Sequence, residues 1–190
     1  KVDTYKNISF SKVGILLGEN YVLTYREKGA TILSSLKERL YSDPNFSKDV
    51  SYLFYNILDY LINEYIPAID RYDDKIEDLE AIIIKETPSS DILRQVNNIR
   101  GKITHTRRLI AAEKEAYNEL LTIYGYMIKS EKNVYFRDLN DQLDKVIYKL
   151  DTQKEEIIGL INLHAGLSSQ KLNELIKFLT VVSATFMPAT

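Results

Sequence analysis

The chain has 190 residues, and because 45% of them are hydrophobic it can bury a sizeable core. Its net charge of −2 argues against a nucleic-acid scaffold, since phosphate binding leaves a basic surface. The lack of cysteine excludes disulfide frameworks and thiolate metal sites. With only 7 Gly and 4 Pro, there is little room for an all-β fold rich in turns.

Residues 11–25 are predicted to form a β-hairpin. Two β-rich runs, residues 13–17 and 21–25, flank Gly18-Glu19-Asn20, a loop of the length and composition that suits a hairpin turn. Residues 30–41 are predicted to form a short amphipathic helix that ends at Asp43-Pro44. Two strands are not stable alone, so we expect this region, residues 1–46, to be part of a larger sheet-containing unit.

A long helical hairpin is predicted over residues 47–130. From Leu58 to Ile83 the apolar residues are spaced alternately four and three apart, as in a heptad seam. The pattern indicates one helix over residues 47–86, kinked or bent at Pro67 and ended by the stop and N-cap in residues 87–90. A return arm keeps the same period over residues 92–127, except at Thr106 and Glu113, and the short turn makes the arms antiparallel.

Charge supports this pairing of the two arms. Acidic residues dominate residues 63–80 and basic residues dominate residues 94–114. A turn at Pro88 places the acidic arm beside the basic one, which favours a solvated face with cross-helix ion pairs. A surface that collects cations is the alternative interpretation of the acidic run.

A third helix is predicted to begin near Tyr135, within the last segment, residues 131–190. No breaker stronger than Gly159 and Gly166 precedes Pro188, so the helix would be roughly 75 Å long and would need other helices or other copies beside it. No charge follows Lys177. A membrane span needs about 20 apolar residues, so this run alone does not prove one, but its place at the end of the chain favours a helix entering a membrane.

The sequence shows no carrier of enzymatic chemistry. It has no Gly-rich phosphate loop and no nucleophile elbow, and its two histidines, His105 and His164, lie on different arms. Carboxylates are the remaining candidates for binding. Asp138 and Asp141 share one face at the start of the third helix, where they suit either a hard cation such as Mg²⁺ or, as the pattern alone favours, the helix dipole.

Four separated motifs resemble the CorA family of magnesium transporters, in the right order over residues 10–190. Tyr135-Phe136-Arg137-Asp138-Leu139, followed by Asp141, is similar to the family's YFRDVYDH stretch. Residues 52–59 through Glu64-Tyr65 are similar to its YLLY.LLD…DEY helix. Residues 167–180 and 186–190 are similar to the segment that leads into its first membrane helix, and the hairpin with the short helix suits the end of its αβα head.

The resemblance implies a mainly α fold: a long antiparallel helical hairpin and a long stalk helix, with a small remnant of the αβα head, truncated in the first membrane helix. It implies a homopentamer in the inner membrane, with this part on the cytoplasmic side, and Mg²⁺ as both transported and regulatory ion, with Co²⁺ as a second ion. Asp138 corresponds to the family's sensor aspartate and Asp59 to an aspartate of a second cation site. The partner carboxylates of the first site are expected upstream of Lys1.

The resemblance also implies which residues line the pore. These are Asn162, Asn173, Ile176, Thr180, Met187 and Thr190. Asn162 replaces an acidic residue at the funnel mouth, and Ile176 replaces a gating methionine while keeping a hydrophobic constriction. Two alternatives stay open: the corresponding part of a ZntB-type zinc transporter, and a soluble helical scaffold without a transport role.

Overall fold

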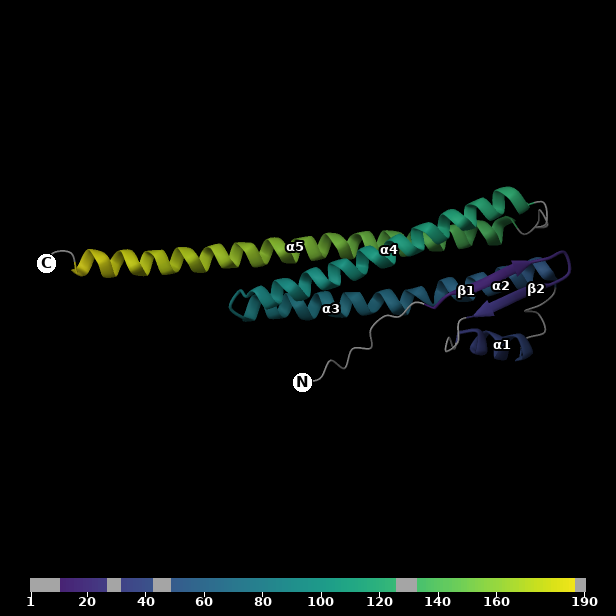
Figure 1. Cartoon of the computed structure of the whole chain (residues 1–190), viewed down its shortest axis with the longest axis horizontal. Coiled ribbons are helices and arrows are strands. Elements are labelled where there is room, and N and C mark those ends of the chain that lie inside the picture. The colour runs from purple at the N-terminus through teal and green to yellow at the C-terminus, as the bar shows by residue number, and fades with distance from the viewer. Residues whose placement is uncertain (1–10, 27–31, 43–48, 126–132, 187–190) are drawn as a thin grey trace. The chain divides into compact units, whose positions relative to one another are not determined.

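The computed structural model describes residues 11–26, 32–42, 49–125 and 133–186. Its elements are β1 (Val13–Leu17), β2 (Val22–Arg26), α1 (Ile32–Ser42), α2 (Val50–Asn63), α3 (Tyr65–Lys85), α4 (Ser90–Tyr124) and α5 (Asn133–Phe186), as Figure 1 shows. The predicted mainly α fold with a small β-hairpin is therefore confirmed. The end of the predicted return arm at residues 126 and 127, and the predicted residues from 187 onward, Met187 and Thr190 among them, lie outside the described residues.

The chain divides into two compact units, which we describe separately. The first consists of Lys1–Ile69 and Leu109–Tyr148, and the second of Asp70–Arg108 and Lys149–Thr190. The boundaries expected from the sequence, after residues 46 and 130, describe successive segments and stay a prediction.

In the first unit, β1 pairs antiparallel with β2 from Val13↔Arg26 to Leu17↔Val22. The Gly18 N–H donates to the Tyr21 carbonyl at 2.9 Å and closes the turn. A Cβ on Gly18 would lie 2.6 Å from the exposed Tyr21 ring, so a larger residue here would have to displace that ring. The hairpin and the short helix after it are thus confirmed, and both β2 and α1 contact α2.

The helix predicted over residues 47–86 is divided at Glu64 into α2 and α3. Pro67 explains the position of the break. Its ring nitrogen has no N–H to donate to the Asn63 carbonyl four residues earlier, and its ring would meet that same carbonyl. The interruption therefore lies one turn before the proline. At its other end α2 is capped by Asp49, whose side chain accepts the Tyr52 N–H at 2.8 Å.

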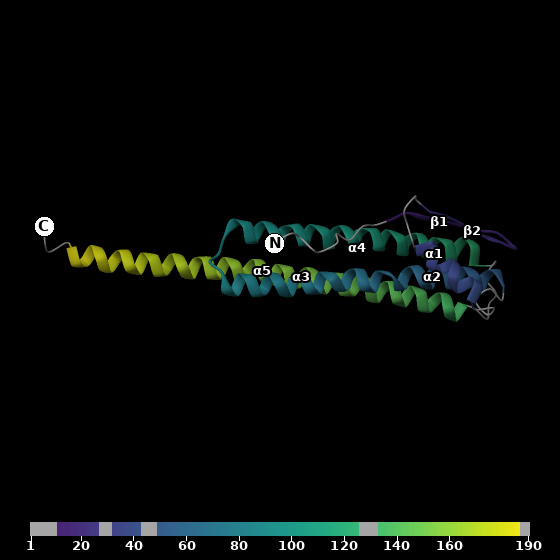
Figure 2. The same ribbon diagram turned by 90° about the horizontal axis from the view of Figure 1, so that it is seen from below.

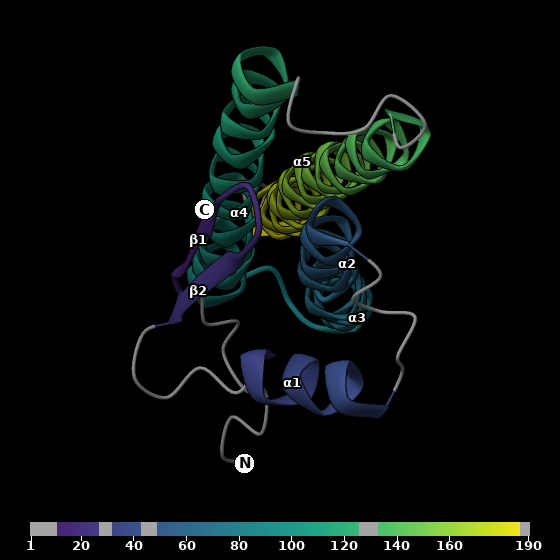
Figure 3. The ribbon, with the colours of Figure 1, turned by 90° about the vertical axis from the view of Figure 1, so that its right-hand side faces the viewer.

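Aromatic side chains contribute to the core of the first unit together with aliphatic ones. There α2, the end of α4 and the start of α5 lie around a common centre (Figure 3). The rings of Phe54 and Phe136 stack with centroids 6.0 Å apart. The Tyr117 hydroxyl donates to the Phe136 carbonyl at 2.5 Å, in a buried position. These contacts fix the first turn of α5 against α2 and α4.

In the second unit, α3 and α4 run antiparallel and pack with α5 around an apolar core. Its buried members follow the predicted spacing on α3 and α4 and a matching spacing on α5: Tyr72, Ile76, Leu79, Ile83, Ile92, Val96, Ile99, Ile103, Leu150, Ile157 and Leu160. The helix predicted after residue 90 begins with Ser89 as its cap, whose hydroxyl accepts the Ile92 N–H at 3.4 Å. The ring nitrogen Nε2 of the buried His164 lies 3.0 Å from the Ser89 carbonyl oxygen, which satisfies it.

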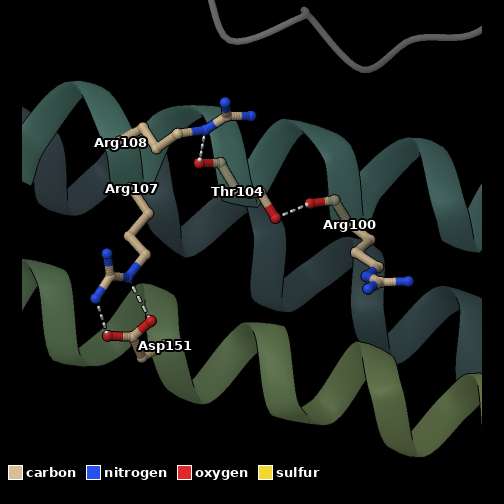
Figure 4. A network of polar contacts seen from close by, with 5 residues as sticks. All are labelled: Arg100, Thr104, Arg107, Arg108 and Asp151. Atoms are coloured by element: carbon tan, nitrogen blue, oxygen red, sulfur yellow. Dashed lines mark hydrogen bonds and ion pairs between the residues drawn. The ribbon is translucent and has the colours of Figure 1, made fainter.

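Inter-helix ion pairs in the second unit converge on α5. The Arg107 guanidinium on α4 binds both carboxylate oxygens of Asp151, at 2.5 and 3.0 Å (Figure 4). Lys149 pairs with Asp70 and Asp73 on α3. Because the side chains of Arg107 and Asp151 are 37% and 41% exposed, their pair contributes only about 0–1 kcal/mol. The acidic and basic arms are thus each paired with α5, while direct pairing between them stays a prediction.

Helix α5 continues without interruption through Gly159 and Gly166. Its last turns run past the connection between α3 and α4 with no other described helix beside them (Figure 2). Large apolar side chains there are exposed: Leu172, Leu175, Ile176, Phe178, Leu179, Val181 and Phe186. Within the described ranges, no helix is both long enough and apolar enough to cross a membrane.

Candidate metal site and exposed helix face

Two of the predicted metal ligands, Asp59 on α2 and Asp138 on α5, meet at one amide group in the first unit. The side-chain nitrogen Nε2 of Gln142 lies 2.9 Å from Asp138 Oδ2 and 3.1 Å from Asp59 Oδ1. An amide NH₂ group carries two hydrogens, so it can donate to both carboxylates at once. The fold therefore brings together two aspartates that the sequence places on separate helices.

The packing of α5 determines where Asp138 and Gln142 lie. Phe136, Leu139 and Leu143 are buried and turn one face of α5 inward. Asp138 and Gln142 are one helical turn apart, so their side chains are neighbours along the flank of that face. The stacked Phe54 and Phe136 rings hold α2 against this part of α5.

A tyrosine borders the two carboxylates. Burial, followed by the negative charges of Asp59 and Asp138, raises the pKa of Tyr55 to about 12. The phenol therefore stays neutral at physiological pH and adds no charge to the two aspartates. Its ring lies 5.2 Å from that of Tyr135 and 6.0 Å from that of Tyr52, centroid to centroid. The site is thus acidic, with a wall of aromatic rings on one side.

The donor set suits a hard divalent cation but is incomplete within the described residues. Carboxylate and amide oxygens are the ligands that Mg²⁺ prefers, usually together with several waters. The described part of the chain contains no group of three or more His, Cys, Asp or Glu residues that could hold a metal ion. Asp141 is exposed on α5, and among the described residues it does not form a group of three possible ligands with Asp59 and Asp138. Its role as a ligand stays a prediction.

The acidic run of α3 borders a cavity in the second unit. Asp73, Glu77 and Glu80 line it together with Glu156 of α5, over a volume of about 550 Å³. Burial and then the charges of Asp73, Glu80 and Glu77 raise the pKa of the Glu156 carboxyl, whereas Lys149 opposes that change. Ile76 and Leu160 add apolar surface to the lining. The polar part of this lining is thus acidic, and the alternative interpretation of the acidic run stays a prediction.

The predicted pore-lining residues that the structure describes share one exposed face of α5. Asn173, Ile176 and Thr180 follow Asn162 by close to whole helical turns, about three, four and five of them. All four side chains are exposed. The Thr180 hydroxyl donates to the Ile176 carbonyl at 2.8 Å, which leaves its oxygen lone pairs directed outward. This face is polar except at Ile176.

Sequence reasoning missed Gln142 and Tyr55. Gln142 lies four residues after Asp138, and that spacing could have identified it as a neighbour on the same helix face. Tyr55 lies four residues before Asp59 and could have been found in the same way. The meeting of the two aspartates at Gln142 has no signal in a single sequence, because it depends on how α2 packs against α5.

Comparison with known proteins identifies the family of the chain. The pattern of the family described as CorA-like Mg²⁺ transporter proteins matches residues 2–190. A relative from Thermotoga maritima, named cobalt/magnesium transport protein CorA, is 26% identical over 181 residues, which cover 94% of this chain and 51% of that protein. The chain thus spans about half the length of this relative.

Two solved structures share the fold. The full-length CmaX protein superposes with a TM-score of 0.79 and 18% identity, covering 94% of this chain and 54% of that one. The CorA magnesium transporter of Methanocaldococcus jannaschii superposes with a TM-score of 0.73 and 17% identity, covering 93% of this chain and 60% of that one.

Proposed function

Because this chain belongs to the family of CorA-like Mg²⁺ transporter proteins, we propose that it is the cation-sensing and funnel-forming part of a homopentameric divalent-cation transporter. In this proposal it lies on the cytoplasmic side of the inner membrane, and α5 continues into the membrane. The transported and regulatory ion is Mg²⁺, with Co²⁺ as a second substrate. No nucleic-acid partner is involved.

The observation that carries the proposal is the meeting of Asp59 and Asp138 at Gln142. Two carboxylates beside a neutral tyrosine attract a divalent cation, which replaces the amide donor between them. The remaining ligands are waters and carboxylates from the preceding part of the protein or from a neighbouring copy. A cation bound there acts as a sensor only if it binds the closed state more tightly than the open one.

Helix α5 connects the sensor to the permeation path. Asp138 and the exposed stripe from Asn162 to Thr180 belong to one uninterrupted helix. In a ring of five copies the stripe would present amide and hydroxyl oxygens to the water shell of Mg²⁺, which gives up its waters reluctantly. The Ile176 side chains would form an apolar constriction that closes by dewetting.

The donor chemistry favours Mg²⁺ over Zn²⁺ as the ion of this site. The chain has no cysteine, and the meeting residues offer only oxygen ligands and an amide. Zinc prefers nitrogen and sulfur ligands, whereas oxygen ligands suit Mg²⁺. The experiment must therefore distinguish a Mg²⁺ transporter from a zinc transporter of the same architecture.

The experiment is uptake by the full-length protein in proteoliposomes, with Mg²⁺, Co²⁺ and Zn²⁺ offered separately. The proposal expects saturable Mg²⁺ uptake that falls as Mg²⁺ is raised on the side that corresponds to the cytoplasm. Uptake of Zn²⁺ without Mg²⁺ uptake would assign the chain to a zinc transporter. Absence of any divalent uptake would support a scaffold role.

A further inference from the structure

The two polar atoms of the Gln142 amide differ in their hydrogen bonding. Its nitrogen donates to Asp138 at 2.9 Å and to Asp59 at 3.1 Å. Its oxygen Oε1 is shielded from solvent, and no donor among the described residues reaches it. Ionised carboxylates accept hydrogen bonds but cannot donate them, so the NH₂ end must face the aspartates while no cation is present.

This orientation satisfies the carboxylates at the expense of the amide oxygen. A buried carbonyl oxygen without a donor is an unfavourable feature that native structures mostly avoid. A cation between Asp59 and Asp138 reverses the preference, because it repels the positive end of the amide dipole and attracts the oxygen. A rotation of the amide group by half a turn then makes the same side chain an oxygen ligand.

We propose that Gln142 is a switchable third member of the Asp59–Asp138 site, donating to both carboxylates in the absence of a cation and ligating the cation through Oε1 when one is bound. This inference rests on the proposed cation site. Because the amide already donates to both carboxylates of the empty site, an incoming cation must displace two hydrogen bonds. Gln142 thus sets the concentration at which the sensor responds.

The first test replaces the donor by an acceptor. Gln142→Glu has nearly the same shape but offers only oxygens, so it can ligate the cation and cannot stabilise the empty site. We expect it to lower the Mg²⁺ dissociation constant of the full-length protein, measured by calorimetry, by roughly tenfold or more, since affinity follows the ligand charge count. Lys145→Gln, on an exposed turn of α5, makes the same change of net charge and is the matched control.

A second measurement follows the amide itself. With glutamine labelled by ¹³C at the side-chain carbonyl, the infrared band that disappears in Gln142→Leu belongs to Gln142. We expect Mg²⁺ to shift this band in the otherwise wild-type protein, and we expect no shift in Asp138→Asn. This readout does not depend on the folding of the Gln142→Glu variant.

The outcomes separate this inference from the function on which it rests. If Asp138→Asn leaves Mg²⁺ binding unchanged, the cation site itself is wrong. If Asp138→Asn weakens binding but the Gln142 band does not shift, or Gln142→Glu binds no more tightly than Lys145→Gln, the site stands and the switch is wrong. A shifted band together with tighter binding by Gln142→Glu supports both.

Discussion

The hydroxyl groups of Tyr72 on α3 and Thr106 on α4 lie 2.9 Å apart in the buried core of the second unit. Thr106 occupies a position of the heptad seam at which an apolar side chain is expected, and it is only 2% exposed. The hydrogen bond satisfies both hydroxyls, so the polar residue is compatible with burial.

Removing one partner should therefore cost more than removing both. Thr106→Val or Tyr72→Phe alone leaves one buried hydroxyl unpaired and should lower the free energy of unfolding by about 1–3 kcal/mol. The double variant should lose clearly less than the sum of the two single losses, because no unpaired hydroxyl remains. Urea unfolding of the four proteins measures the cycle, and strictly additive losses would rule out the coupling.

Ile76 tests the helical seam itself. It is 6% exposed, so Ile76→Asp places an unpaired charge in the core and should destabilise the helical hairpin by several kcal/mol. Ile84, on the same helix, is 63% exposed. Ile84→Asp is the matched control and should change stability by no more than about 0.5 kcal/mol. Equal melting temperatures of the two variants would show that the seam is not buried.

Glu113 gives the first unit a pH dependence. The Tyr65 hydroxyl donates to its carboxylate, which lowers the pKa of Glu113, but burial of the carboxyl group outweighs this and raises it. The folded chain thus binds the proton more tightly than the unfolded chain. The resulting stabilisation is fully present below the ordinary pKa of about 4.3 and is lost as pH rises through the higher folded-state value.

Glu113→Gln should remove this loss while keeping an oxygen that accepts from Tyr65. We expect the stability of the variant relative to wild type to increase between about pH 4 and pH 7. The increase should be modest, since the Glu113 side chain is exposed to solvent. Glu115→Gln removes the same charge from an exposed position. Chemical unfolding at both pH values measures the difference, and a relative stability that does not change with pH would contradict the prediction.

Asn162 tests the exposed stripe of α5 as a permeation path. In the full-length pentamer, Asn162→Asp would create a ring of negative charge and should raise conductance at low ionic strength. The gain should disappear at high salt, because screening shortens the reach of the ring potential. Asn98→Asp on α4 adds the same charge elsewhere. Equal conductance of Asn162→Asp and wild type at both salt concentrations would place Asn162 outside the path.

The spacing of apolar residues was sufficient to predict the helices, because a helix that buries one face carries apolar residues at regular intervals. The spacing from Ile69 to Ile83 predicted a buried face, and those residues are buried. The division of the long helix at Glu64 was harder to predict from the sequence. Pro67 signalled a disturbance, but the affected carbonyl belongs to Asn63, one turn earlier.

The candidate site was only partly predictable. Residue types and motifs identified Asp59 and Asp138 separately, whereas their approach depends on how two distant helices pack. Glu113 interrupts the apolar spacing of the heptad seam. Its carboxylate accepts a hydrogen bond from the hydroxyl of Tyr65 on another helix, which explains the polar residue. A polar residue within a hydrophobic pattern indicates that it has a hydrogen-bond partner. Only the tertiary structure shows which residue that partner is.

The most direct test of the account is inhibition of transport by internal Mg²⁺ in full-length protein carrying Asp138→Ala. Without this carboxylate the regulatory cation loses its preference for the closed state, so currents or uptake should persist at internal Mg²⁺ concentrations that silence the wild type. Asp91→Ala, which removes an exposed carboxylate from α4, should keep normal inhibition. If Asp138→Ala is inhibited by Mg²⁺ over the same concentration range as the wild type, Asp138 does not belong to a cation sensor and the central claim is wrong.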